Sequence, residues 1–176
     1  MKSSSTNRGE NSFLKPRKAD LESVVDIYKL IRGNPDELIV RPIGDIVRNI
    51  DRFFVIYRQG KLAGCVSYTI LPEAGDFTRT SIEISSLVVR DDMRGLGIGR
   101  RLVAAVVGAI RDLHVHQIIA LTLTPGFFRK LDFVEIPKTE ILHKIYTGCI
   151  NCMKHTNPFT CPEVAMVYTP HYKEQP

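Results

Sequence analysis

The sequence predicts an α/β or α+β fold in which a mixed β-sheet is flanked by helices. Three observations lead to this prediction. Two strand-like runs are joined across a short turn, which is the pattern of a hairpin. A third apolar run leads through a glycine-rich turn into a long apolar helix pattern, and a fourth leads into a short helix. These four runs cover residues 53–57, 62–71, 82–89 and 117–123.

The N-terminal part predicts a short edge strand and two helices. The strand is expected over Phe13 to Arg17, where a proline restricts pairing. Asp20 is a suitable N-cap for the first helix, and Gly33-Asn34-Pro35 ends it. A second helix is expected over residues 43–49. Its apolar face is expected to consist of Ile43, Ile46, Val47 and Ile50.

The remaining elements follow from the hydrophobic pattern. Residues 58–61 are expected to form the hairpin turn, and residues 72–79 a loop. The helix that begins at Ile98 is apolar on nearly all sides through Leu113, so it should pack into the sheet. A short helix over 125–131 and a last strand over 163–168 complete the prediction.

Length and composition indicate a globular domain. The chain has 176 residues, 44% of them hydrophobic and 24% charged, and we expect a polar, disordered tail over 1–11 and a single domain over 12–176. No apolar run approaches the roughly 20 residues that span a bilayer, and no signal-peptide core is present. We therefore expect a cytoplasmic protein with no membrane partner, whose four cysteines are not disulfides.

The most informative motif is the run Arg94-Gly95-Leu96-Gly97-Ile98-Gly99, between a strand and a helix. A glycine-rich turn at a helix N-terminus aims unpaired N–H groups at one point and binds anions, usually phosphate. The run lacks the Gly-Lys-Ser/Thr ending of a P-loop and the glycine spacing of a dinucleotide fold. It does fit Arg-x-x-Gly-x-Gly. The alternative interpretation is a flexible turn that is glycine-rich by chance.

That motif is the pyrophosphate loop of the GNAT N-acetyltransferases, which the chain resembles over residues 13–168. The resemblance implies a mainly antiparallel mixed sheet and acetyl-CoA as co-substrate. It also implies that the strand before the loop pairs through its main chain with pantetheine. The implied coenzyme-binding residues are Leu87, Val88, Val89, Arg94, Gly95, Leu96, Gly97, Ile98, Gly99 and Arg100.

The net charge of +5 does not indicate nucleic-acid binding, because no basic stripe with interleaved aromatic residues is present. Several arginines instead gather near the glycine-rich loop, where a basic rim suits the anionic coenzyme. The alternative is a solvated basic surface. The arginines concerned are Arg90, Arg94, Arg100 and Arg101.

Glu83 is the candidate general base. It stands inside an apolar strand, where an unpaired carboxylate is costly to bury. An acceptor amine is mostly protonated at neutral pH, so amine acetylation benefits from a base. The resemblance implies this role for a glutamate of this strand, acting directly or through water. The alternative is a structural carboxylate that pairs with a nearby arginine or lies at a sheet edge.

The C-terminal part is similar to short, stand-alone amino-acid N-acetyltransferases of the N-acetylglutamate synthase type. The segments that carry this similarity are Lys144-Ile145-Tyr146, Cys149-x-x-Cys152, Pro158-Phe159 and Cys161-x-Glu163-x-Ala165-Met166. It implies a small amino-acid substrate, with L-glutamate as the leading acceptor in the first step of arginine biosynthesis. Since related acetyltransferases are often dimers, it also implies a homodimer.

Two cations are implied as ligands of the acceptor's carboxylates. Arg41 precedes the second helix, and Lys144 lies in the C-terminal part. An arginine suits a carboxylate because its fork binds both oxygens. For each residue, an ordinary surface charge is the alternative.

The general acid has no clear candidate. Related enzymes often place a tyrosine and a glycine after the fifth strand, but this chain has Phe128 and Asp132 there. Phe128 has no proton to give and is expected to pack against coenzyme or core. Water or Tyr146 is then left to protonate the thiolate, which can also depart without help.

The cysteines of the C-terminal part have a zinc-like spacing, with Cys149-x-x-Cys152-x-x-His155 followed by Cys161. A single Cys-x-x-Cys with a third cysteine is a weaker pattern than two such pairs. We therefore favour a loop of reduced thiols over the active site, without metal. Cys65 is expected in the core, so a covalent acetyl-cysteine route is not favoured.

Two alternatives to an amino-acid acetyltransferase remain open. The first is a GNAT enzyme that acts on another amine, such as a polyamine, a drug or a protein terminus. The second is a non-catalytic module that binds acyl-CoA, which needs the glycine-rich loop but no base. Glu83 counts against the second alternative.

Overall fold

The computed structural model describes residues 14–73, 76–152 and 154–171. The expected disordered tail over 1–11 therefore lies outside the described residues. No helix in the described part is long and apolar enough to cross a membrane.

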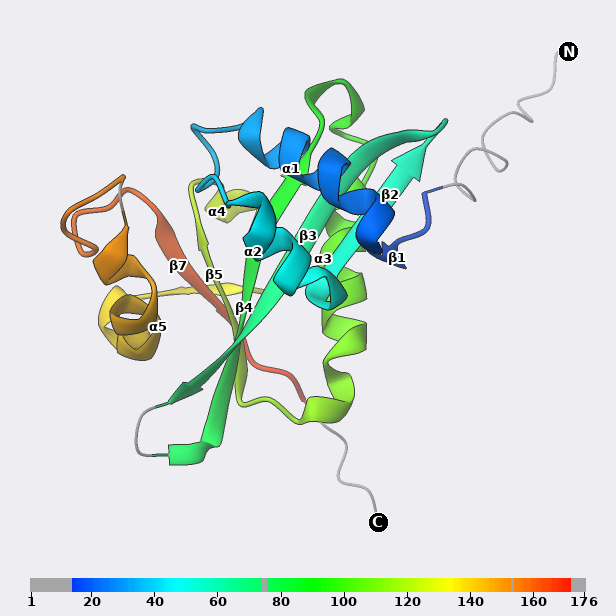
Figure 1. Ribbon diagram of the computed structural model, residues 1–176. Helices are drawn as coiled ribbons and strands as arrows, with labels where there is room; N and C mark the ends of the chain where they lie inside the picture. The colour runs from blue at the N-terminus through cyan, green and yellow to red at the C-terminus, as the bar shows by residue number, and fades with distance from the viewer. Residues whose placement is uncertain (1–13, 74–75, 153, 172–176) are drawn as a thin grey trace, which may run out of the picture. The chain divides into compact units, whose positions relative to one another are not determined.

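The described residues form a seven-stranded sheet in the order β1-β2-β3-β4-β5-β7-β6 (Figure 1). The strands are β1 (Arg17–Lys18), β2 (Phe53–Arg58), β3 (Lys61–Glu73), β4 (Asp76–Val89), β5 (Gln117–Thr122), β6 (Val134–Ile136) and β7 (Val164–Tyr168). The α-helices are α1 (Val24–Arg32), α2 (Ile43–Arg48), α3 (Ile98–Ala109), α4 (Pro125–Arg129) and α5 (Leu142–Thr147). The β4–β5 pair is parallel, and β1–β2, β2–β3, β5–β7 and β6–β7 are antiparallel. The mixed, mainly antiparallel sheet is thus confirmed.

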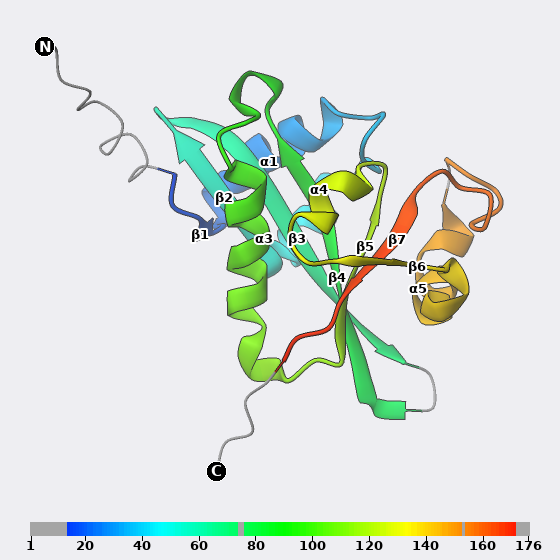
Figure 2. The ribbon, with the colours of Figure 1, turned by 180° about the vertical axis from the view of Figure 1, so that it is seen from behind.

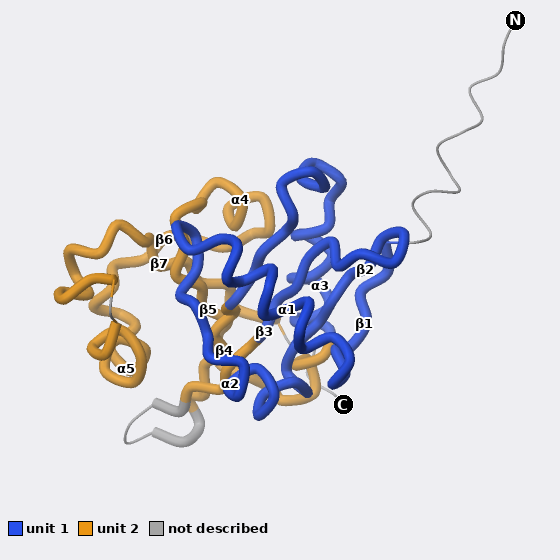
Figure 3. Tube along the Cα trace, turned by 45° about the horizontal axis from the view of Figure 1, so that its top comes forward, with its two compact units in different colours: residues 1–67, 86–108 blue, residues 68–85, 109–176 orange. Residues whose placement is uncertain are grey.

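The chain divides into two compact units, which Figure 3 shows in different colours. The first unit contains residues 1–67 and 86–108, and the second contains 68–85 and 109–176. The strands β3 and β4 are each divided between the two units.

The first unit is built on the β2–β3 hairpin. Its two-residue turn places Gln59 at φ 49° and Gly60 at φ 73°. Positive φ at both central positions matches the right-handed twist of the flanking strands. The predicted hairpin is therefore confirmed, and the pairing runs from Arg58↔Lys61 to Phe53↔Ser67.

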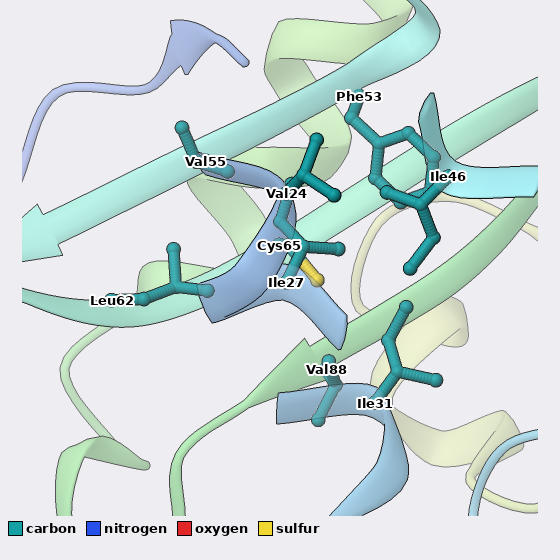
Figure 4. Close-up of a cluster of buried hydrophobic side chains, with 9 residues drawn as sticks. All are labelled: Val24, Ile27, Ile31, Ile46, Phe53, Val55, Leu62, Cys65 and Val88. Carbon is teal, nitrogen blue, oxygen red and sulfur yellow. The ribbon is translucent and has the colours of Figure 1, made fainter. Parts of the chain in front are cut away.

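Helices cover both faces of this hairpin. The helices α1 and α2 lie on one face, and α3 lies on the other (Figures 1 and 2). Asp20 was predicted to cap the first helix, and its Oδ1 does accept a hydrogen bond from the Ser23 N–H at 3.0 Å, but the element that it caps is a short 3₁₀ turn that leads into α1. The core under α1 and α2 consists of Val24, Ile27, Ile31, Ile46, Phe53, Val55, Leu62, Cys65 and Val88 (Figure 4).

Cys65 is a core residue, as expected. Its side chain is fully buried, and burial raises the pKa of the thiol to about 12. The Sγ–H group donates to the carbonyl oxygen of Ser86 at 3.6 Å. A thiol held neutral in this way does not supply a nucleophilic thiolate at neutral pH.

Gly64 allows close approach of three elements in this unit. A Cβ at Gly64 would lie 2.8 Å from the Val88 carbonyl oxygen and 3.1 Å from side-chain atoms of Ile98 and Leu102. Only glycine therefore lets β3 pack this closely against β4 and α3.

Gly64→Ala is expected to lower the free energy of unfolding by about 1–3 kcal/mol, because the backbone of β4 must shift to admit the methyl group. Urea unfolding followed by circular dichroism measures this loss. Gly108→Ala in α3 is the control, since a Cβ there meets no heavy atom within 4 Å. A Gly64→Ala midpoint equal to that of the wild type would contradict the close approach.

The second unit centres on β7, which lies between β5 and β6 in the sheet. Ile118 to Thr122 pair with Tyr168 to Val164. A small core of Leu71, Ile119, Ile141 and Ala165 packs there, with Leu121, Ile136 and Val167 beside it.

The structure corrects several predicted boundaries. The expected loop over 72–79 is wrong, because β3 continues to Glu73 and β4 begins at Asp76. Phe77 and Thr78 are residue types that favour strand geometry, and the turn is correspondingly shorter. The helix from Ile98 ends at Ala109, and a 3₁₀ turn follows that leaves Leu113 exposed.

The predicted face of α2 is also only partly correct. Ile46 is fully buried and Ile50 packs beside the core, but Ile43 and Val47 are exposed. A helix of six residues makes fewer than two turns, so it presents few positions to the core. The short β6 and α5 were not predicted, because three and six residues carry little periodicity.

Candidate active site

The glycine-rich loop lies in the first unit, between β4 and α3. The Arg90 N–H still donates to the Ala63 carbonyl at 3.0 Å, after which the chain turns through Asp91–Met93. Gly95 and Gly97 then adopt φ values of 80° and 74°. Left-handed backbone at these two positions explains why glycine occupies both.

The helix α3 begins directly after this turn. The Arg101 N–H donates to the Gly97 carbonyl at 3.1 Å, so the first helical hydrogen bond starts within the loop. The buried Ile98 side chain anchors this start. The N–H groups of the first turn have no partner within a helix and carry the positive end of its dipole. The loop therefore has the geometry of a site for a phosphate group.

Two arginines near the loop are engaged with carboxylates of the same unit. Arg94 Nη2 lies 2.8 Å from Glu37 Oε1 and 2.9 Å from Asp91 Oδ1. The hydrogen bond that Arg94 donates to Glu37 is the main cause that raises the pKa of Arg94. Arg90 Nη2 lies 2.7 Å from Asp92 Oδ2. The expected rim of basic residues is therefore partly neutralised, and Arg94 ties the loop to the segment before α2.

The strand that enters the loop carries a local irregularity that the sequence analysis missed. Ser86 is buried and adopts φ 52°, an uncommon conformation for a residue with a side chain. The signal available in the sequence was the polar pair Ser85-Ser86 inside an apolar run. After Ser86, the strand continues as Leu87, Val88 and Val89, of which Val88 belongs to the core.

The parallel pairing between β4 and β5 covers only a short register. It runs from Ser81↔Gln117 to Glu83↔Ile119 and ends there. Main-chain groups of β4 after Glu83 are then candidates for pairing with a ligand rather than with β5.

Glu83 and Lys144 form a close ion pair in the second unit. Lys144 Nζ lies 2.7 Å from Glu83 Oε1, and the side chains are only 15% and 11% exposed. Lys144 is therefore not a surface charge. The alternative to a general base was a structural carboxylate paired with an arginine. Glu83 does have such a cationic partner, but it is a lysine. A buried pair of this kind is compatible with either role of Glu83.

Arg41 lies in the first unit, just before α2. Its Nη1 atom lies 3.1 Å from Asp45 Oδ2, and its side chain is 24% exposed. Arg41 is thus partly buried and paired within its own segment.

The cysteines of the C-terminal part lie in the second unit as free thiols. Cys149 and Cys152 flank a 3₁₀ turn, and Cys161 Sγ lies 3.8 Å from Glu163 Oε2. Burial raises the pKa of the Cys149 thiol; Lys144 opposes this effect, whereas Glu83 and Glu163 add to it. Within the described ranges, no group of three or more His, Cys, Asp or Glu is arranged to hold a metal ion.

Phe128 and Asp132 stand where related enzymes often have a tyrosine and a glycine, and the structure explains both. Phe128 is buried, with its ring edge-on to Phe127 and Phe133 at centroid distances of 5.1 Å. Asp132 adopts φ 64°, so the turn does require left-handed backbone. Aspartate tolerates that conformation better than most residues with side chains. Tyr146 on α5 is 65% exposed.

Comparison with known proteins assigns the class. Residues 21–133 match the model of the acetyltransferase (GNAT) family, and the chain belongs to that family. It is 32% identical over 155 residues to an uncharacterised N-acetyltransferase of Chlorobaculum tepidum, covering 87% of this chain and 94% of that protein. It is also 30% identical over 88 residues to an amino-acid acetyltransferase of Mycobacterium tuberculosis, covering 49% of this chain and 47% of that protein.

Solved structures agree on the fold. N-acetylglutamate synthase from Neisseria gonorrhoeae, complexed with coenzyme A and N-acetyl-glutamate, aligns with a TM-score of 0.73 at 23% identity. The alignment covers 91% of this chain but only 36% of the Neisseria chain. A Mycobacterium tuberculosis protein in complex with CoA aligns with a TM-score of 0.73 at 21% identity, covering 89% and 99% of the two chains. Both neighbours hold coenzyme A, in agreement with acetyl-CoA as co-substrate.

Proposed function

We propose that this N-acetyltransferase transfers the acetyl group of acetyl-CoA to the α-amine of an amino acid, with L-glutamate as the leading acceptor. The ion pair of Glu83 and Lys144 is the observation that carries the proposal. It holds a carboxylate and an ammonium group 2.7 Å apart at largely buried positions. An amino acid presents an ammonium and a carboxylate on one carbon atom. The pair is therefore complementary in charge to the acceptor.

In the proposed reaction, Glu83 accepts a proton from the acceptor's ammonium group. The neutral amine attacks the thioester carbonyl carbon, a C–N bond forms, and the C–S bond breaks. Coenzyme A leaves as a thiolate, which water or Tyr146 protonates. The second amine proton passes to solvent. The transfer is direct, in a ternary complex, because the buried Cys65 offers no thiolate to carry the acetyl group.

Lys144 is proposed to bind the acceptor's carboxylate. An ammonium group has three N–H donors, so one bond to Glu83 leaves others for the substrate. Arg41 is the second proposed cation, although it contacts Asp45 in the free protein. The main-chain groups of Leu87–Val89 are proposed to pair with pantetheine, and those of Gly95–Arg100 to bind the pyrophosphate, with support from the left-handed glycines.

The relatives support an amino-acid acceptor. The names of the Mycobacterium relative and the Neisseria neighbour point to amino-acid and glutamate acetylation, respectively. We further propose that residues 12–176 act as one cytoplasmic domain in the first step of arginine biosynthesis, and as a homodimer. No nucleic-acid or membrane partner enters the proposal.

An acceptor screen tests the proposal. The purified chain is mixed with acetyl-CoA and a panel of amino acids, polyamines and peptide termini, and thiol release is recorded. Glutamate is expected to give the highest kcat/KM, and Lys144→Met and Arg41→Met to raise the KM for glutamate more than that for acetyl-CoA. Turnover with a non-amino-acid amine alone would favour the first alternative. Acetyl-CoA binding by calorimetry, without turnover on any amine, would favour the binding module.

A further inference from the structure

Gly148 contacts the ammonium group that pairs with Glu83. A Cβ placed on Gly148 would lie 2.7 Å from Lys144 Nζ, 3.5 Å from Lys144 Cε and 3.6 Å from the Lys144 carbonyl oxygen. A distance of 2.7 Å is far inside van der Waals contact. The lysine side chain therefore folds back over the end of its own helix, into space that only a glycine leaves open.

The backbone of Gly148 does not itself require glycine. Its φ and ψ are −134° and −50°, outside the left-handed region. Its N–H donates to the Lys144 carbonyl at 3.0 Å, and any residue except proline can make that bond. What glycine specifically provides at this position is room for the Lys144 ammonium group.

The ammonium group is thus bounded on two sides. Glu83 Oε1 holds it at 2.7 Å, and the bare Cα of Gly148 allows it to reach that place. The end of α5, whose dipole is negative, further favours a cation there. An added methyl group at Gly148 would therefore force Nζ, the end of a flexible side chain, to leave its present place beside Glu83.

We propose that Gly148 is a positioning residue for acetyl transfer, which sets the place of the Lys144 ammonium group beside the Glu83 carboxylate. The inference rests on the proposed function, in which Glu83 takes the proton and Lys144 binds the acceptor's carboxylate. Gly148 touches neither substrate nor reacting atoms in this scheme. It acts through Lys144 alone.

Gly148→Ala tests the proposal directly. It is expected to lower kcat/KM for the acceptor roughly ten- to a hundredfold, as small misplacements near reacting groups do. The KM for the acceptor is expected to rise more than the KM for acetyl-CoA, because Lys144 is the group proposed to bind the acceptor's carboxylate. Gly126→Ala in α4 is the matched control, since a Cβ there meets no heavy atom within 4 Å. It is expected to keep the wild-type kcat and KM values.

A double-mutant cycle separates positioning from a general structural effect. Lys144→Met removes the Nζ atom that the alanine methyl group would displace. If Gly148 acts through that atom, Gly148→Ala has no further effect on kcat/KM or on the KM for the acceptor in the Lys144→Met background. An equal additional loss in both backgrounds, or wild-type kinetics of Gly148→Ala, would overturn the proposal.

The cycle also has a readout that needs no acceptor. Gly148→Ala is expected to lower the free energy of unfolding in the wild-type background and to leave it unchanged in the Lys144→Met background. Additive losses would again overturn the inference. Failure of the proposed function is recognised separately, because the acceptor screen would then show no turnover with any amino acid, whatever Gly148→Ala does in the unfolding cycle.

Discussion

Glu83→Gln is expected to lower kcat by about 10²–10⁴-fold, the usual contribution of a positioned general base. Glutamine keeps the size of the side chain and an oxygen for Lys144, but it cannot accept the amine proton. Steady-state thiol release at saturating acetyl-CoA and glutamate measures the loss. The KM for acetyl-CoA should change little, because the glycine-rich loop is intact.

The double variant Glu83→Gln/Lys144→Met decides between the two roles of Glu83. Glu83→Gln alone leaves the largely buried Lys144 ammonium without its counter-charge, which costs stability whatever the role of Glu83. The double variant removes both charges and should recover much of that stability. Because loss of Lys144 is expected to raise the KM for glutamate, the comparison is of kcat at saturating glutamate, and a purely structural carboxylate predicts that this kcat recovers with the fold. A general base predicts a stable protein that remains inactive, which is the result we expect.

Gly97→Ala is expected to weaken acetyl-CoA binding about tenfold. The residue adopts φ 74°, and left-handed backbone costs a residue with a Cβ roughly 1–2 kcal/mol. The loop therefore either stores this strain or leaves the conformation that aims its N–H groups at the pyrophosphate. Isothermal titration calorimetry with acetyl-CoA measures the affinity directly.

Gly108→Ala is the matched control for that experiment. It makes the same change in the helix that follows the loop, where a Cβ meets no heavy atom within 4 Å. Because alanine favours helix over glycine by about 0.8–1.0 kcal/mol, this variant should be as stable as the wild type or more so, with unchanged affinity. If Gly97→Ala binds acetyl-CoA as tightly as Gly108→Ala, the loop does not hold the coenzyme as proposed.

Much of the fold was predictable because it depends on local chemistry. The Gln59-Gly60 turn joins two strands with a matching twist, and Asp20 caps its helix through a residue three positions away. The wrong or missing predictions of secondary structure also have local causes. The proline and glycine after Leu71 predict a loop where the strands in fact continue, and the short β6 and α5 carry too little periodicity to be recognised.

The candidate site was predictable only in part. The sequence points to Glu83 and Lys144 separately. It suggests an arginine as the structural partner of Glu83 and the substrate as the partner of Lys144, and it does not predict that the two residues pair with each other. The arginines near the glycine-rich loop were expected to face the coenzyme, whereas Arg94 binds Glu37. Partner choice among charged side chains depends on which of them folding brings within a few ångströms.

The amino-acid order alone thus specifies the family, the glycine-rich turn and the helix behind it, since these depend on residues that are neighbours along the chain. Tertiary structure decides three features of the site. These are the Glu83–Lys144 ion pair, the left-handed backbone of Ser86 inside β4, and the space at Gly148 into which the lysine folds. The physical reason is that backbone propensity acts over a few residues, whereas burial and ion pairing act between segments that only the folded chain brings together.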